Sequence, residues 1–64
     1  MNIQKGICRI KLKSGLIAFG EVLEVGDNHI RFLDFDPSAI GKSIPVANIV
    51  EFEPCDEDDV PAYE

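Results

Sequence analysis

Three consecutive polar residues, Asp27, Asn28 and His29, are the group in this sequence best suited to contact a nucleobase or a small ligand. The Asn amide both donates and accepts hydrogen bonds, and an imidazole ring can stack on a base. The same residues suit a hairpin turn, where Asp and Asn are favoured because their side chains satisfy the local backbone. Both interpretations, a binding loop and a plain turn, stay open at the level of sequence.

Basic side chains recur at every second position near the N-terminus, at Arg9, Lys11 and Lys13, with Arg31 as a candidate fourth member. Alternate residues of an extended strand lie on one face, so these cations are expected to form a basic stripe. Such a stripe can contact the phosphates of a nucleic acid. The alternatives are a solvated strand face, or a face that pairs with the acidic C-terminal segment.

Acidic residues gather at the other end of the chain. The net charge is −6, and residues 51–64 contain seven acids and no base, so residues 1–50 are nearly neutral. An acidic tail does not bind phosphates, because that binding needs Lys and Arg. It is a candidate contact for a partner protein, or a tethered screen over the basic stripe. The candidate tail residues are Asp56, Glu57, Asp58, Asp59, Val60 and Tyr63.

The residues that catalysis and metal binding require are scarce. His29 is the only histidine, and the sequence has no Ser/His/Asp arrangement and no phosphate-cradling glycine motif. Cys8 and Cys55 stand far apart, and with one histidine they are too few soft ligands for zinc. We expect Cys8 in the core and Cys55 at the surface. The sequence predicts a protein that is not an enzyme and holds no metal and no cofactor.

The elements that must position these groups are strands, within the one small core that 64 residues allow. Alternating and β-branched residues predict five strands separated by turn residues, with no amphipathic helix of useful length. Gly15 belongs to the turn after the first strand, and Gly20 is expected to bend the second. The predicted strands are residues 7–13, 16–25, 29–35, 43–46 and 49–53.

These strands predict an all-β domain, a small five-stranded SH3-like or Sm-like barrel over residues 1–54. The acidic tail at 55–64 is expected to be disordered. The expected core residues are Cys8, Ile10, Leu12, Ile17, Phe19, Val22, Val25, Ile30, Phe32, Ile44, Val46, Val50 and Phe52. No apolar run approaches the length of a membrane span, so we expect a cytoplasmic protein without membrane contact.

Two segments resemble the Sm and Sm-like family of small barrels. Ile10-Lys11-Leu12-Lys13-Ser14-Gly15 followed by Gly20-Glu21-Val22 is similar to the first Sm motif, and residues 44–52 are similar to the closing strands of Sm-like and SH3-like barrels. The resemblance implies a barrel that forms rings through its edge strands and binds RNA. The family's pocket residues do not carry over, because Gly26 and Ile30 stand where it has Asp and Asn, and its Arg-Gly is replaced by Val46-Ala47-Asn48. Only the structural glycines Gly15 and Gly20 carry over.

Two functions follow as hypotheses. The first is a self-assembling, non-enzymatic Sm-like module that binds single-stranded RNA, another nucleic acid or a nucleotide through the 27–29 loop and the basic stripe. The second is a protein–protein interaction module or inhibitor, whose acidic tail makes the contact or imitates nucleic-acid phosphates. A homo-oligomer is expected in either case, because the core is small and the second strand is apolar on both faces.

Overall fold

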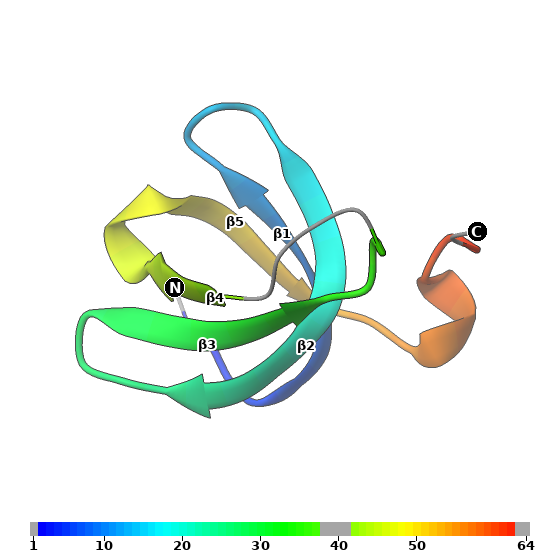
Figure 1. Cartoon of the computed structure of the whole chain (residues 1–64), viewed down its shortest axis with the longest axis horizontal. Coiled ribbons are helices and arrows are strands. Elements are labelled where there is room, and N and C mark those ends of the chain that lie inside the picture. Colours follow the sequence, from blue (N-terminus) through cyan, green and yellow to red (C-terminus); the bar gives the residue numbers. More distant parts are fainter. Residues whose placement is uncertain (1, 38–41, 63–64) are drawn as a thin grey trace.

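The computed structural model describes residues 2–37 and 42–62, which form one five-stranded antiparallel sheet (Figure 1). The strands are β1 (Gly6–Leu12), β2 (Ile17–Val25), β3 (His29–Asp34), β4 (Lys42–Pro45) and β5 (Ile49–Pro54). Their order in the sheet is β4-β3-β2-β1-β5. The all-β class and the five predicted strands are confirmed, and the described residues contain no α-helix.

Short turns join neighbouring strands where glycine or small polar residues let the chain reverse. Gly15 has a φ of +92°, a left-handed conformation that favours glycine, and its N–H donates to the Leu12 carbonyl at 2.9 Å. The β2–β3 hairpin is closed by a bond of 2.8 Å from the Gly26 N–H to the His29 carbonyl. A 3₁₀ turn, η1 (Val46–Asn48), leads directly from β4 into β5.

β2 and β5 each contain one residue that has no partner on the neighbouring strand, and this extra residue changes the face that the following side chains occupy. The pairing of β2 with β3 skips Leu23, and the pairing of β5 with β1 skips Val50. Such bulges bend a strand and interrupt its alternation. Val50 is therefore exposed although Phe52, two residues on, packs against the core, and Ile49 is buried in its place. Leu23, at the other bulge, is exposed as well.

The core lies on the inner face of the curled sheet. Its buried residues are Cys8, Ile10, Ala18, Val22, Ile30, Phe32 and Ile49, and Ile3, Leu12, Ile44, Val46 and Phe52 pack against them. No polar side chain is buried in the part of the chain that the structure describes. The inner face is thus held together by apolar packing.

Four residues that the sequence assigns to the core lie outside it, namely Ile17, Phe19, Val25 and Val50. Ile17 is 50% exposed because β2 directs Ala18 and Val22 inward instead. Both faces of β2 are apolar, so the alternation of its residues cannot tell the inner face from the outer one. The prediction for Val50 is wrong because the bulge in β5 removes it from the inner face.

Gly20 occupies the inner face of β2 at the point of closest packing against β3. A Cβ atom at this position would collide with the Leu33 carbonyl oxygen and would lie 2.5 Å from Cζ of Phe32. Real Cβ atoms do not approach other heavy atoms so closely, so only glycine lets the Phe32 ring lie here. Close packing against β3 thus requires glycine at position 20.

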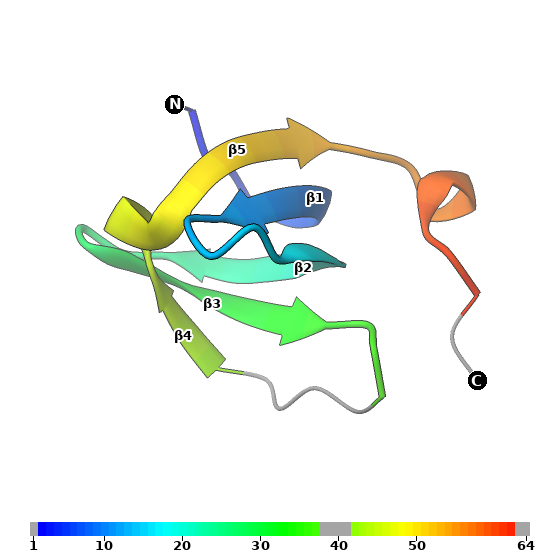
Figure 2. The same ribbon diagram turned by 90° about the horizontal axis from the view of Figure 1, so that it is seen from above.

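The sheet does not close into a barrel through strand pairing. Across residues 2–37 and 42–62 no ladder joins β4 to β5, and the two strands diverge from η1 (Figure 2). They are the two edges of the sheet, connected only by the three residues of η1.

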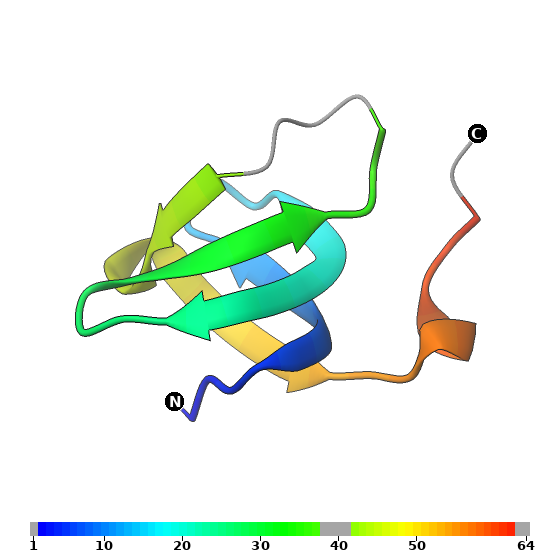
Figure 3. The same cartoon turned by 60° about the horizontal axis from the view of Figure 1, so that its bottom comes forward.

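The C-terminal segment continues past the end of β5 and stands away from the sheet (Figure 3). The sequence predicts disorder here, whereas residues 57–59 form one 3₁₀ turn, η2 (Glu57–Asp59). The reason is local, since the Asp56 N–H donates to Oδ2 of Asp59 at 3.1 Å and the Asp59 N–H donates to the Asp56 carbonyl at 2.9 Å. Tyr63 lies outside the described residues.

Candidate interaction surfaces

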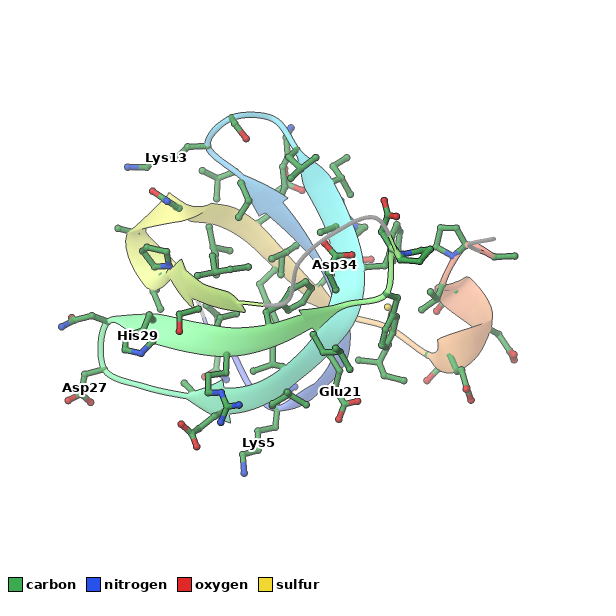
Figure 4. The ribbon with its side chains drawn as sticks, viewed as in Figure 1. Lys5, Lys13, Glu21, Asp27, His29 and Asp34 are labelled. Atoms are coloured by element: carbon green, nitrogen blue, oxygen red, sulfur yellow. The ribbon has the colours of Figure 1, made fainter. Side chains whose placement is uncertain are left out.

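The β2–β3 hairpin presents Asp27, Asn28 and His29 to solvent at one end of the sheet. Figure 4 shows the side chain of Asp27 pointing away from the ribbon, whereas the exposed ring of His29 lies across the hairpin near Gly26. The Asn28 carbonyl accepts a hydrogen bond from the Val46 N–H at 2.8 Å, so this hairpin and η1 lie side by side. The three predicted ligand-binding residues therefore share one exposed loop, next to the turn between β4 and β5.

The four predicted basic residues do not form one stripe. Arg9 and Lys11 lie on the outer face of β1, and Lys13 follows in the turn to β2. Arg31 lies on β3, and β2 runs between β3 and β1. The cross-strand neighbour of Arg31 is Glu24. The structure thus divides the predicted basic surface into two parts, and the Arg31 part has an acid beside it.

Acidic residues of β5 lie opposite the basic residues of β1. In the antiparallel register Arg9 faces Glu53 and Lys11 faces Glu51. Nη2 of Arg9 donates a hydrogen bond to Oε1 of Glu51 at 3.3 Å and lies 3.7 Å from Oε2 of Glu53. The sequence raises the acidic tail as a partner for these cations, but β5 supplies the acids that contact Arg9. A phosphate would have to displace these carboxylates, so the face suits phosphate poorly.

The outer face of the sheet also carries apolar side chains that the core does not use. The register places Ile7 of β1, Ile17 and Phe19 of β2 and Leu33 of β3 on this face, and we call these four residues the outer apolar strip. Ile17 is 50% and Leu33 46% exposed. Diagonal neighbours on adjacent strands are within reach of large side chains, so the strip runs across three strands. Contiguous exposed apolar surface is a mark of an interaction site.

Glu21 lies within the outer apolar strip. It pairs with Ile7 on β1 and with Leu33 on β3, so one carboxylate stands between two apolar side chains. Its side chain projects from the ribbon (Figure 4) and has no ion-pair partner among the residues described. Sequence reasoning missed this residue, because its two apolar neighbours come from strands that only folding brings together.

The acidic tail begins at the border of the strip. The Cys55 N–H donates to the Ile7 carbonyl at 3.1 Å, so the chain leaves β5 alongside one end of β1. The four acids at 56–59 follow immediately and are exposed, whereas Val60 is half-buried. The acidic segment therefore starts one residue after a backbone contact with Ile7.

Both cysteines are free thiols, and they differ in their surroundings. Cys8 is fully buried, and burial, followed by the nearby Cys55, raises the pKa of Cys8 to about 11. The pKa of the half-buried Cys55 is also raised, first by its burial and then by the carboxylates of Asp59, Glu53 and Asp56. Both groups stay protonated at neutral pH, so neither is an activated nucleophile.

No metal centre is evident in the described residues, where no three His, Cys, Asp or Glu side chains gather as ligands would. Nor does the described part of the chain contain a helix long and apolar enough to cross a membrane.

Comparison with known proteins finds no relative of this chain. The sequence matches no family profile and no curated protein, and the fold matches no solved structure.

Proposed function

We propose that this protein is a non-enzymatic module that binds another protein. The carrying observation is the composition of the outer face, where acids of β5 contact Arg9 while Ile17 and Leu33 of the outer apolar strip are about half exposed. A nucleic-acid surface needs the reverse, with free cations that can release counterions from phosphates. The net charge of −6 adds a general repulsion of nucleic acid.

The acidic tail extends this protein-binding surface. Its four acids follow Cys55, which is hydrogen-bonded to the backbone of β1 at the strip. Negative charge beside apolar area favours a partner with basic residues near its own apolar contact. An inhibitor of a nucleic-acid-binding protein is one form that this function can take, since the tail would then occupy a phosphate site.

The finer architecture that we propose is an SH3-like or Sm-like barrel, left open between β4 and β5. Three features support it. The strands follow one another in antiparallel order, β5 returns to pair with β1, and a single 3₁₀ turn separates β4 from β5. The close packing of Gly20 against Phe32 agrees with a curled sheet of this kind.

Self-association belongs to the same proposal. β4 and β5 are the edges of the sheet and each is paired on one side only in the described residues, so an edge of one copy can add to an edge of the next. Each copy carries a charge of −6, and salt screens the repulsion between copies. Self-association should therefore strengthen as the salt concentration rises.

Nucleic-acid binding is the second candidate, and one observation favours it. The bond between Asn28 and Val46 holds two loops together, and three polar side chains are exposed beside them. A loop pair of this kind could hold a base without help from Arg9. This candidate function predicts nucleic-acid binding that depends on Asn28 and His29.

A gel shift tests the choice between these functions. The full chain is titrated into single-stranded oligouridine RNA, and into the DNA of the same length, at about 50 mM and about 200 mM salt. We expect no shift at either salt concentration. Light scattering on the same samples reports the oligomeric state, and recovery of the tagged chain from nuclease-treated cells should retain a protein partner.

RNA binding that falls steeply with salt would overturn the proposed function. The variants Asn28→Ala and His29→Ala would then test whether the RNA site lies in the hairpin. Lys5 is an exposed cation on the N-terminal side of β1, and Lys5→Ala is the control. The hairpin is the site if the first two variants weaken RNA binding and the control does not.

A further inference from the structure

The outer apolar strip and Glu21 together specify the chemistry of a partner. We propose that this face docks an amphipathic helix of a partner protein, with basic residues placed along its apolar stripe. The inference rests on the proposed function and names the partner class. A helix packed on a sheet is a standard way to cover an apolar sheet face. Among the described residues the core lies on the inner face, while Ile17 and Leu33 of the outer face are about half exposed.

Glu21 is the reason that the partner must bring a cation. Its carboxylate lies between Ile7 and Leu33, so any apolar surface that covers the strip also covers the charge. A covered carboxylate without a partner is strongly unfavourable. Lys and Arg meet both needs, because their stems cover apolar surface while their charged ends reach the carboxylate. The acids at 56–59 add negative potential at the same border.

A second copy of this chain fits the strip poorly. Two copies placed face to face would bring their Glu21 side chains into one interface, and each copy carries a charge of −6. Like charges across an interface oppose association. On β1, Arg9 stands two residues from Ile7, the partner of Glu21, and is already in contact with Glu51 and Glu53. The charge pattern therefore selects a basic partner over self-pairing at this face.

The probe for this inference is a helical peptide of leucine and lysine with one apolar face. Its control is a peptide of the same composition with a scrambled order and no apolar face. Fluorescence anisotropy with the full chain should give an affinity about tenfold higher for the first peptide. The preference should persist at salt concentrations that weaken both peptides, because apolar contact is not screened.

Matched variants locate the site. Leu33→Ser should lower the affinity for the apolar-faced peptide about tenfold, since it removes one apolar contact. Ile17→Ser should act in the same direction, and Glu21→Gln should weaken the salt dependence. Val25→Ser is the control, because Val25 is 43% exposed like Leu33 but pairs with the buried Ile30 on the other side of the sheet. It should leave the affinity unchanged.

The outcomes separate this inference from the proposed function. Equal affinity for both peptides, or equal losses with Leu33→Ser and Val25→Ser, overturns the inference but leaves a protein-binding function in place. A change from oligomer to monomer with Leu33→Ser, seen by light scattering, assigns the strip to contacts between copies and also overturns it. RNA binding without a preference for the apolar-faced peptide overturns both. Circular dichroism of each variant confirms that it is folded.

Discussion

The two faces of the sheet follow the same alternation of residues but carry different surfaces. The inner face holds apolar side chains such as Ile10, Ile30 and Val22, each at most 1% exposed. The outer face holds Ile17 and Leu33, about half exposed, among paired charges. Inner residues are explained by folding, because they form the core. The exposed apolar residues contribute less to folding, and the proposed function gives them a role in binding.

Within the single strand β2, inward residues contribute to stability and outward residues belong to the proposed binding surface. In β2, Gly20 faces inward against Phe32 and Ile17 faces outward, three residues away. A change on the inner side should cost stability, and one on the outer side should cost binding. The first two predictions test the inner face, and the last tests the charges of the outer face.

Gly20→Val should have the largest effect on the free energy of unfolding. Its Cβ would collide with the Leu33 carbonyl and approach the Phe32 ring to 2.5 Å, and a backbone atom cannot move aside as a side chain can. We expect a loss of about 3 kcal/mol, which leaves so small a domain largely unfolded. Urea denaturation followed by circular dichroism measures it.

Ile17→Ser on the outer side of the same strand is the control for that experiment, with a change of about 0.5 kcal/mol or less. A Gly20→Val variant as stable as the parent would contradict the packing described around Phe32.

Cys8 provides a test of the inner face by pH. Burial raises its pKa from 9.0 to about 11, so the folded state holds the proton more tightly than the unfolded state does. The stability from this group is complete below pH 9.0 and is lost as pH rises from there towards 11. Between about pH 8 and about pH 10 the free energy of unfolding should fall by about 1 kcal/mol from this group.

The measurement is a set of urea titrations under reducing conditions, with Cys8→Ala as the comparison. Subtracting the variant removes the contributions of the groups that both proteins share. Cys55→Ser should reduce the slope as well, because the pKa of Cys55 is raised and Cys55 contributes to the raised pKa of Cys8. An identical pH dependence for the parent and Cys8→Ala would contradict the burial of this thiol.

Much of the fold could be predicted from the sequence, because each strand is a local pattern bounded by turn residues. The five strands and the turn at Gly15 follow from residues that lie close together along the chain. The inner face of β2 could not be assigned, since Ile17 and Phe19 are more apolar than Ala18, which folding buries. The single-residue bulges at Leu23 and Val50 leave no local signature either.

The candidate site was less predictable for a related reason. The basic residues of β1 alternate in the sequence, and so do Glu51 and Glu53, but the two strands lie about forty residues apart in the chain. Only their pairing shows that these acids contact Arg9. The position of Glu21 between Ile7 and Leu33 likewise depends on three strands meeting. Sequence identifies which residues are charged, and the register decides which charges remain available.

The smallest expected change in stability comes from the acids beside Arg9. Replacing Glu51 and Glu53 by Gln should alter the free energy of unfolding by less than about 1 kcal/mol, because such exposed ion pairs contribute little. Its effect on binding should be visible, since Arg9 and Lys11 then become free cations beside an apolar strip. The double variant should bind single-stranded RNA at low salt, where the parent does not.

The control is Glu57→Gln with Asp58→Asn, which removes two charges from the tail instead. If both variants gain RNA binding equally, the total negative charge of the parent protein is what prevents RNA binding. If only the β5 variant gains RNA binding, the pairing of Arg9 with Glu51 and Glu53 is what prevents it.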